Sequence, residues 1–279
     1  AACVIGNNIV VTRWDENGTQ DMSFGSNGKT TITFSGFTVH GRDIESDSRD
    51  RIVICVRLDQ NVPQYIALVR LSLDGVPDPQ FGNQGKALIT YGTDRLFPND
   101  ITIDQTDGIA IATASQDAGL LVKRFGIFML RQDGSFNTDF NGTGIRIHTI
   151  STASEARAIV IQPDGKVVVA GTVENDPRGS FMLVRYLSDG SIDNLFGDQG
   201  FVFKSFYDQT DAPNAVKLTN DNNIIVAGYM RHTRQPGIPK ADMVIMKLTP
   251  NGIPSPEFGQ NGTVLFDHAA DDENILSLN

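Results

Sequence analysis

The chain has 279 residues, 40% of them hydrophobic, and its 33 acidic side chains outnumber 23 basic ones, which gives a formal net charge of −10. This balance argues against general binding to nucleic acid or anionic membranes, and no apolar run approaches the roughly 20 residues of a membrane-spanning helix. We therefore expect a soluble globular protein with no nucleic-acid partner and no membrane insertion. The chain begins Ala1-Ala2-Cys3 without an initiator methionine, so we expect a processed chain or a piece of a longer one.

One motif, F-G-x-x-G, recurs along the whole chain. Its five copies begin at Phe24, Phe81, Phe140, Phe196 and Phe258, and the spacings between them are 57, 59, 56 and 62 residues. A near-constant period is typical of repeat architectures. We expect each phenylalanine to fill a core and the glycines to adopt backbone conformations closed to other residues. The chain is therefore predicted to be a single domain, 1–279, of five repeats of roughly 58 residues.

Each repeat contains four strand-length runs, which we name A to D in chain order. The clearest unit, 155–206, contains ARAIVIQ, KVVVAGTV, FMLVRYL and GFVFKSF. Pro163-Asp164-Gly165 is a tight-turn signal between the first two runs. A second turn ending in glycine precedes F-G-x-x-G in all five copies. Convincing helical periodicity is missing, so the pattern predicts an all-β fold.

The two ends of the chain are complementary. The first repeat starts within a strand B, at 2–5, and therefore lacks a strand A, whereas the last residues, ENILSLN at 273–279, align with strand A. We expect a five-bladed β-propeller with four antiparallel strands per blade, in which the N- and C-terminal strands share one blade and close the ring. An open solenoid is the alternative, and it would need capped ends.

The fourth repeat resembles a known propeller repeat. Its runs IVIQPDGKVVVAG, from Ile159, and FMLVRYLSDGSIDNLFGDQG, from Phe181, closely resemble the delta-60 repeat, which occurs mostly in secreted or surface-attached bacterial proteins. The second repeat departs in its strand A, GRDIESDSRD, and the third has Asn141 in place of the first glycine of the motif. The resemblance implies a propeller fold and an extracellular or cell-surface location, and it implies no shared catalytic residues.

Several repeated positions have a structural interpretation. One position of strand C is basic in four repeats, at Arg13, Arg70, Arg185 and Lys247, and the position three residues before the motif phenylalanine is acidic at Asp21, Asp78 and Asp193. Both positions lose their charge in the third repeat, so we expect an Arg–Asp contact within most blades. Trp14 aligns with apolar positions of the other repeats and is expected in the core. Cys3 and Cys55 lie in apolar runs and are expected to be buried and unpaired.

The start of strand A, which is innermost in a propeller, carries a polar residue in every repeat. These residues are Arg42, Asn99, Arg157, Asn214 and Asn274. They either cap the strands and hold channel water, or form a ring that binds a polar or anionic ligand.

The next position is Asp43 and Asp100 in two adjacent repeats but apolar in the others. Two such carboxylates could act as acid and base on a glycosidic bond if roughly 5 to 9.5 Å apart. The alternative is that they are buried and paired with Arg42, Arg157 or backbone amides.

The B–C connections differ in length, whereas the A–B and C–D turns are short. Antiparallel order places the B–C and D–A connections on one face, and variable loops on a constant scaffold usually carry binding diversity. The B–C connections include Tyr65, Lys123, Arg124, Arg178, Arg231, His232, Arg234 and Lys240. This face is therefore expected to be locally basic, although exposed loops are commonly polar in any case.

Four scattered histidines and two cysteines give no zinc-binding spacing, and no nucleotide-binding motif occurs, so we expect no metal and no cofactor. The leading expectation is a non-enzymatic binding or scaffold propeller, carbohydrate-binding or adhesive, with a glycan or another protein as partner. One alternative is a glycan-cleaving enzyme that uses Asp43 and Asp100. Another is a structural component of a larger surface or particle assembly, and the oligomeric state is left open.

Overall fold

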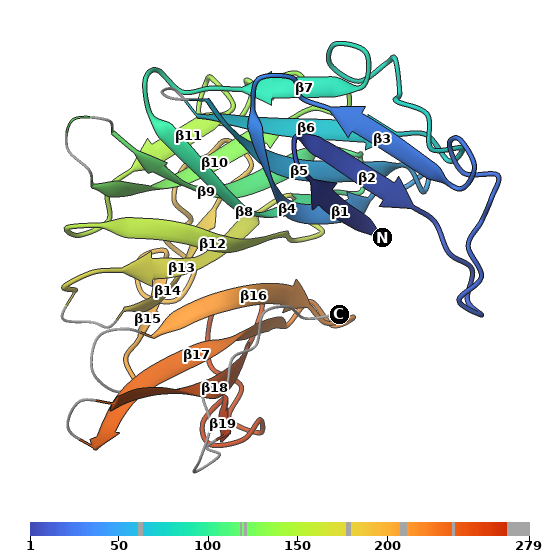
Figure 1. Ribbon diagram of the computed structural model, residues 1–279. Coiled ribbons are helices and arrows are strands. Elements are labelled where there is room, and N and C mark those ends of the chain that lie inside the picture. Colours follow the sequence, from blue (N-terminus) through green and yellow to red (C-terminus); the bar gives the residue numbers. More distant parts are fainter. Residues whose placement is uncertain are drawn as a thin grey trace.

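The computed structural model of the protein describes residues 1–60, 64–117, 119, 122–176, 180–206, 211–235 and 238–266, with backbone only at 231–240. The described residues form nineteen β-strands and no helix, which confirms the all-β expectation. The strands fall into five antiparallel sheets, each a meander in chain order (Figure 1). The five repeats of the sequence therefore correspond to five sheets.

The first sheet has three strands, and they are β1 (Ala2–Ile5), β2 (Asn8–Thr12) and β3 (Lys29–Thr33). The second sheet comprises β4 (Thr38–Ser46), β5 (Ile52–Asp59), β6 (Tyr65–Leu71) and β7 (Lys86–Ile89). The third comprises β8 (Arg95–Ile103), β9 (Ile109–Gln116), β10 (Lys123–Leu130) and β11 (Ile145–His148). The fourth comprises β12 (Ser154–Ile161), β13 (Val167–Val173), β14 (Phe181–Tyr186) and β15 (Phe201–Lys204). The fifth comprises β16 (Ala212–Leu218), β17 (Ile224–Gln235), β18 (Ile238–Leu248) and β19 (Thr263–Phe266).

The sheets follow one another along a curve, with the first and last sheets at its two ends (Figure 1). The first strands of the sheets, β4, β8, β12 and β16, lie on the inner side of this curve, where each contacts the next. An ion pair of 3.5 Å between Lys217 on β16 and Glu45 on β4 joins the fifth sheet to the second. The inner strands therefore surround a common axis, as the blades of a propeller do.

The expected ring closure depends on residues 273–279, which lie outside the described residues. Within the described ranges, β1 pairs only with β2, and no strand pairing joins the first sheet to the fifth. The first sheet thus lacks an inner strand, as its sequence predicted. The arrangement is consistent with a five-bladed propeller.

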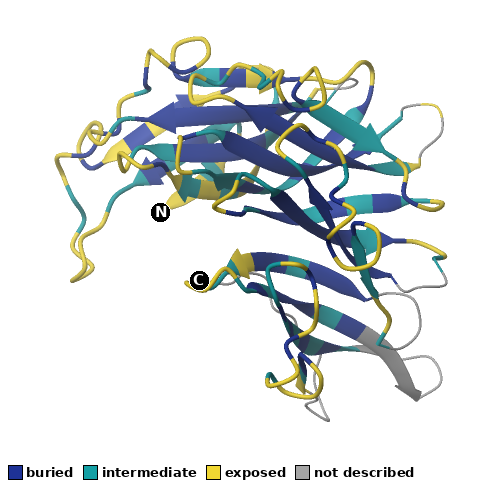
Figure 2. Cartoon of the chain, turned by 180° about the vertical axis from the view of Figure 1, so that it is seen from behind, coloured by how far each residue is buried: buried dark blue, intermediate teal, exposed yellow. Residues whose placement is uncertain are grey.

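The core lies between neighbouring sheets, where buried residues run along the strands while the connections are exposed (Figure 2). Four clusters of buried apolar side chains join the first sheet to the second, the second to the third, the third to the fourth and the fourth to the fifth. None of these four clusters contains residues of both the first and the fifth sheet. Sheet-to-sheet packing therefore repeats once per period of the sequence.

The recurrent motif builds these contacts. The phenylalanines Phe24, Phe81, Phe140 and Phe196 are fully buried. Each is covered by the turn glycine of the following sheet, so that a Cβ at Gly75 would lie 2.8 Å from Phe24 and one at Gly252 would lie 2.8 Å from Phe196. Gly75 also has a φ of 76°, which other residues rarely adopt. The turn glycine therefore serves both the turn and the close approach of two sheets.

A backbone hydrogen bond accompanies each of these contacts. The residue after the phenylalanine donates its N–H to the carbonyl oxygen of the residue before the next sheet's turn glycine. The four bonds are Gly25 to Asp74 at 2.7 Å, Gly82 to Asp133 at 2.8 Å, Asn141 to Asp189 at 2.7 Å and Gly197 to Asn251 at 2.9 Å. Asn141 keeps this bond with a φ of 51°, which explains why it can replace glycine.

The expected Arg–Asp contact is confirmed in three sheets. The ion pairs are Arg13–Asp21 at 2.7 Å, Arg70–Asp78 at 2.9 Å and Arg185–Asp193 at 2.9 Å. Each guanidinium also lies over the motif phenylalanine of its own sheet, at 4.6 to 5.0 Å from the ring centre. It also donates to a backbone carbonyl of the following sheet, at Leu73, Gln132 and Pro250 in turn. The arginine therefore links the core of one sheet to the next.

Two burial expectations are wrong, both in the first sheet. Trp14 is 51% exposed, although the aligned Leu71 and Tyr186 are fully buried. Cys3 is exposed, whereas Cys55 is buried, and both are free thiols. The physical reason is the same in both cases. In the other sheets, the corresponding residues are covered by the preceding sheet or by an inner strand. Among the described residues, the first sheet has no preceding sheet and no inner strand.

Candidate functional site

A β-bulge interrupts each inner strand at the predicted polar position. The register shifts between Gly41 and Asp43, Pro98 and Asp100, Ala156 and Ala158, and Pro213 and Ala215. The extra residues are Arg42, Asn99, Arg157 and Asn214. A bulge leaves its extra residue outside the ladder and re-aims its side chain. The fifth predicted residue, Asn274, lies outside the described part of the chain.

Two of these side chains connect neighbouring inner strands. Asn99 donates to the carbonyl oxygen of Ala156 at 2.7 Å, on the next inner strand. Arg157 donates through Nε to the carbonyl oxygen of Pro213 at 3.1 Å and through a terminal nitrogen to Oδ1 of Asn214 at 2.9 Å. In both cases the acceptor carbonyl belongs to the residue just before the next bulge. The bulge residue of one sheet therefore holds the bulge of the next.

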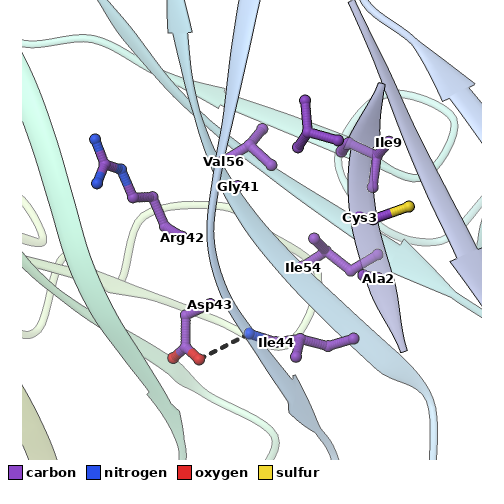
Figure 3. Close-up of a pocket in the computed structure, with 10 residues that line it drawn as sticks. Ala2, Cys3, Ile9, Gly41, Arg42, Asp43, Ile44, Ile54 and Val56 are labelled. Carbon is purple, nitrogen blue, oxygen red and sulfur yellow. Dashed lines mark hydrogen bonds between the residues drawn. The ribbon is translucent and has the colours of Figure 1, made fainter. Parts of the chain in front are cut away.

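Arg42 differs from these residues. It is exposed, and it forms no hydrogen bond or ion pair with the residues that the structure describes. Loss of water around its side chain, followed by the nearby Arg57 guanidinium, lowers the pKa of Arg42, and the carboxylates of Asp59 and Glu155 oppose that shift only in part. Its guanidinium points away from the apolar side chains next to β4 (Figure 3).

Asp43 and Asp100 are brought together by the fold. Asp43 accepts from the backbone N–H groups of Ile44 at 2.8 Å and Ile101 at 3.0 Å, and Asp100 accepts from that of Ile159 at 2.8 Å. Burial raises the pKa of Asp100 to about 8, and the charge of Asp43 and a hydrogen bond with it act in the same direction. The bond from Ile159 and the charge of Lys217 oppose the rise.

The raised pKa favours the protonated form of Asp100 at neutral pH, and the bonds of the two carboxyl groups connect three inner strands, β4, β8 and β12. This contact differs from the separation of roughly 5 to 9.5 Å that glycosidases use, because their paired carboxyl groups must admit a glycosidic bond. Of the alternatives that the sequence left open, pairing with backbone amides is the one that the structure contains.

A cavity of about 390 Å³ lies beside this pair, between β1 and β4 (Figure 3). Apolar side chains form most of its wall, and the lining residues are Ala2, Cys3, Val4, Ile9, Gly41, Arg42, Asp43, Ile44, Ile54 and Val56. The buried thiol of Cys55 lies nearby, where burial first, and then the charge of Asp43, raises its pKa. A thiol held in the neutral form is unreactive.

On the predicted loop face, the basic side chains that the structure describes form ion pairs with acidic side chains. Lys123 pairs with Glu155 at 2.9 Å, and Arg124 pairs with Asp94. Tyr65 packs edge-on against Phe37, with ring centres 5.5 Å apart. Arg178 and the side chains of Arg231, His232, Arg234 and Lys240 lie outside the described residues. In the described part, the basic residues are therefore neutralised by acidic neighbours.

Sequence reasoning missed a buried charge cluster at the opposite face. Arg51 contacts Asp47 at 2.7 Å, Asp78 at 3.2 Å and Asp107 at 3.4 Å, and these carboxylates come from two sheets. The signal was the departure of the second repeat in GRDIESDSRD, which has charged residues where the fourth repeat has the turn Pro163-Asp164-Gly165. This cluster ties the second sheet to the third.

The described residues contain no group of three or more side chains suited to a metal ion. They also contain no helix long and apolar enough to cross a membrane.

Comparison with known proteins matches one part of the chain. Residues 162–196 match the family model described as "Domain of unknown function (DUF5122) beta-propeller". No curated protein matches the chain. The matched stretch contains β13, β14 and Phe196, the first residue of the fourth copy of the recurrent motif. The chain is thus similar, over its most regular repeat, to a family of β-propeller domains.

Proposed function

We propose that the chain is a non-enzymatic binding or scaffold domain that presents the B–C and D–A connections on one face of a five-bladed propeller. The observation that carries this proposal is the bonding of Asp43 and Asp100. Both carboxyl groups are bonded to backbone amides of inner strands, and they contact each other. Groups bonded in this way join neighbouring inner strands, which supports a structural use of these two carboxyl groups.

Glycans or another protein, bound through the loop face, are the proposed partners. Loops on a rigid scaffold are favoured binding positions, and the strands of the hairpin formed by β17 (Ile224–Gln235) and β18 (Ile238–Leu248) are much longer than those of the hairpin formed by β1 and β2. A location outside the cell or at its surface is part of the proposal, and the resemblance of the fourth repeat to the delta-60 repeat supports it. A passive structural role in a larger assembly is the alternative without a ligand.

The experiment that tests this function measures binding and turnover in parallel. Labelled protein is applied to a glycan array, and unlabelled protein is incubated with the bound glycans while released reducing ends are measured. We expect binding without product release. Release that disappears in Asp100→Asn but persists in Asp74→Asn, an exposed control, would instead establish the glycan-cleaving alternative. Absence of binding together with a large self-assembled species in size-exclusion chromatography would establish the structural role.

We also propose that residues 273–279 complete the first sheet and close the ring. β1 is an edge strand in the described structure, with Ile5 60% exposed. The cavity between β1 and β4 is lined mainly by apolar groups and lies where an inner strand of the first sheet would fit (Figure 3). The sequence ENILSLN has the length and apolar pattern of such a strand.

The faces of the first and fifth sheets support this closure. Phe258 is only partly buried, unlike the other four motif phenylalanines. A Cβ at Gly18, the turn glycine of the first sheet, would have no neighbour within 4 Å. The first sheet therefore has a turn glycine without its phenylalanine, and the fifth sheet has a phenylalanine without its glycine. Joining them would repeat the contact made four times elsewhere and would cover Trp14.

The two cysteines provide a direct test of closure. Cys55 is fully buried and remains silent to thiol reagents, so the rate of labelling reports on Cys3. We expect slow labelling of Cys3 in the full chain and fast labelling in a chain that ends at residue 272. Leu276→Asp in the full chain serves as a second variant, and Cys3→Ser confirms the labelled position. Equally fast labelling of Cys3 in the full and shortened chains would show that the strand does not cover β1.

A further inference from the structure

The chain contains five Asn-Gly pairs, and all of them lie in turns. Their asparagines are Asn17, Asn27, Asn141, Asn251 and Asn261. In such a pair the backbone nitrogen of the glycine can reach the asparagine side chain, because glycine has no Cβ to obstruct the approach. The five pairs therefore place one chemistry in five different hydrogen-bonded surroundings.

Two of the pairs form the turn that leads into the outermost strand of the first and the last sheet, β3 and β19 (Figure 1). Asn27 and Gly28 have φ of 53° and 79°, and Asn261 and Gly262 have φ of 50° and 83°. Positive φ at both positions is typical of a two-residue hairpin turn. The second and fourth sheets have the same turn with glutamine in place of asparagine, at Gln84 and Gln199, where φ is 52° and 49°.

The N–H of the glycine in this turn is bonded in the middle sheets. Gly85, Gly144 and Gly200 each donate to the carbonyl oxygen of the motif phenylalanine of their own sheet, at 2.7 to 2.9 Å. Gly28 and Gly262 donate to no acceptor among the residues that the structure describes. The side chains of the asparagines before them are exposed and form no hydrogen bond within the described ranges. The glycine nitrogen and the asparagine amide are therefore both unrestrained in the first and fifth sheets.

The other three pairs hold at least one of these two groups. Gly18 and Gly252 donate their N–H to the carbonyl oxygen three residues earlier, at 3.1 and 3.0 Å. The Asn251 side chain also accepts from Arg185 at 3.1 Å. At Asn141 the side chain is held instead, because its nitrogen donates to a backbone carbonyl of β11 at 2.7 Å. A hydrogen bond that must break before a reaction raises its barrier.

We propose that Asn27 and Asn261 are sites of spontaneous deamidation, with water as the co-reactant, and that the other three Asn-Gly pairs are protected. The glycine nitrogen attacks Cγ of the asparagine and forms a C–N bond that closes a five-membered imide. The C–N bond to the side-chain nitrogen breaks, and that nitrogen leaves as ammonia with the proton of the glycine N–H. Water then opens the imide at either carbonyl and gives aspartate or isoaspartate. This inference is independent of the proposed binding function.

The reaction would change the turn in two ways. A new carboxylate adds negative charge to a chain whose net charge is already −10. Isoaspartate also routes the backbone through the former side chain and so lengthens a turn that is closed by a bond of 2.8 Å from Ser26 to Lys29. The neighbouring Gly25 bonds to Asp74 of the second sheet. Isoaspartate at Asn27 should therefore loosen the contact between the first two sheets.

The test follows all five pairs in one protein. The full chain is incubated in mildly alkaline buffer, and each site is quantified by peptide mapping with mass spectrometry, with isoaspartate distinguished from aspartate by its elution. A parallel incubation in urea gives the rate of each site without structure. The double variant Asn27→Gln/Asn261→Gln is the matched control, because glutamine already occupies this turn at Gln84 and Gln199 and would have to close a less favourable six-membered ring.

We expect Asn27 and Asn261 to react at least about fivefold faster than the other three asparagines in the folded chain, as the loss of one hydrogen bond predicts. The five rates should converge in urea. Equal rates in the folded chain, or no reaction at Asn27 and Asn261, would overturn the proposal. A difference that persists in urea would overturn it as well, because the neighbouring sequence would then be the cause. After incubation, wild type should unfold at a lower temperature than the double variant, and equal unfolding temperatures would refute the loosening of the turn.

Discussion

Asp100→Asn isolates the titration of Asp100, whose pKa is raised in the folded protein. Asparagine can accept from the N–H of Ile159 as the aspartate does, and its amide can donate to Asp43 as the protonated carboxyl does. The substitution therefore keeps the bonds between inner strands and removes the titration. At pH 5, where Asp100 is protonated in the folded protein, we expect wild type and variant to have similar free energies of unfolding.

The two proteins should diverge as the pH rises. The folded protein retains a proton that the unfolded chain has already released, because the pKa of Asp100 rises from 3.8 to about 8 on folding. Between about pH 4 and 8 the folded state thus binds more protons, so its stability falls with rising pH. At 1.36 kcal/mol per pKa unit the full effect is about 4 kcal/mol at pH 7. Access of water to the channel reduces it, so we expect Asp100→Asn to be about 2 to 4 kcal/mol more stable than wild type at pH 8.

Urea unfolding measured from pH 5 to 9 tests this reasoning. The quantity that matters is the difference between wild type and Asp100→Asn at each pH, because other titrating groups cancel in it. Asp74→Asn is the control, since Asp74 is exposed and its variant should track wild type throughout. A difference between wild type and Asp100→Asn that stays constant across this range would refute the raised pKa of Asp100.

Three further outcomes follow from the contacts between sheets. Gly190→Val should lower the free energy of unfolding by about 3 kcal/mol or more, because the glycine has a φ of 84° and a Cβ there would lie 2.9 Å from the N atom of Asn141. Gly18→Val should cause an equal loss if the ring is closed. If the ring is open, Gly18→Val should cause only the smaller loss that comes from backbone strain. Arg185→Met should lower the free energy of chemical unfolding by about 3 to 5 kcal/mol, because it leaves the buried Asp193 unpaired. Arg13→Met changes a half-exposed pair and should lower it clearly less. Equal losses in the two variants would contradict this account. Burial, then the charge of Arg146, lowers the pKa of His148 from 6.5 to about 4. The free energy of unfolding should therefore fall by up to about 3 kcal/mol as the pH drops from 6.5 to about 4. His148→Gln should remove this part of the pH dependence, and an unchanged pH dependence in the variant would count against a neutral His148.

The sequence predicted the fold well because the residues that determine the structure of each sheet lie within a single repeat. The turn glycines, the motif phenylalanines and the alternating strands recur within one period, and the Arg–Asp pair is separated by only eight residues in the three sheets that contain it. Local spacing was therefore enough to predict the strands, the number of sheets and the role of Arg185.

The site was less predictable because its contacts cross between sheets. Arg42 and Arg157 occupy the same position of the repeat, yet only Arg157 bonds to the following strand. Nothing in the spacing distinguishes the two, since the difference depends on which groups the neighbouring sheets present. Trp14 and Cys3 show the same dependence, because burial of a repeat position requires a neighbouring sheet that the aligned sequence does not specify.

The contacts between sheets also have a direction. In the four described contacts, the turn glycine covers the phenylalanine of the sheet before it, and the motif N–H donates to the sheet after it. Each sheet therefore has a head and a tail, and an interface of this kind forms a ring when its rotation closes and an open polymer when it does not. If the ring closes as proposed, a chain that ends at residue 266 would expose one head and one tail that fit each other. Such chains should join end to end as their concentration rises, so the ends of the ring would govern whether the protein stays a single unit.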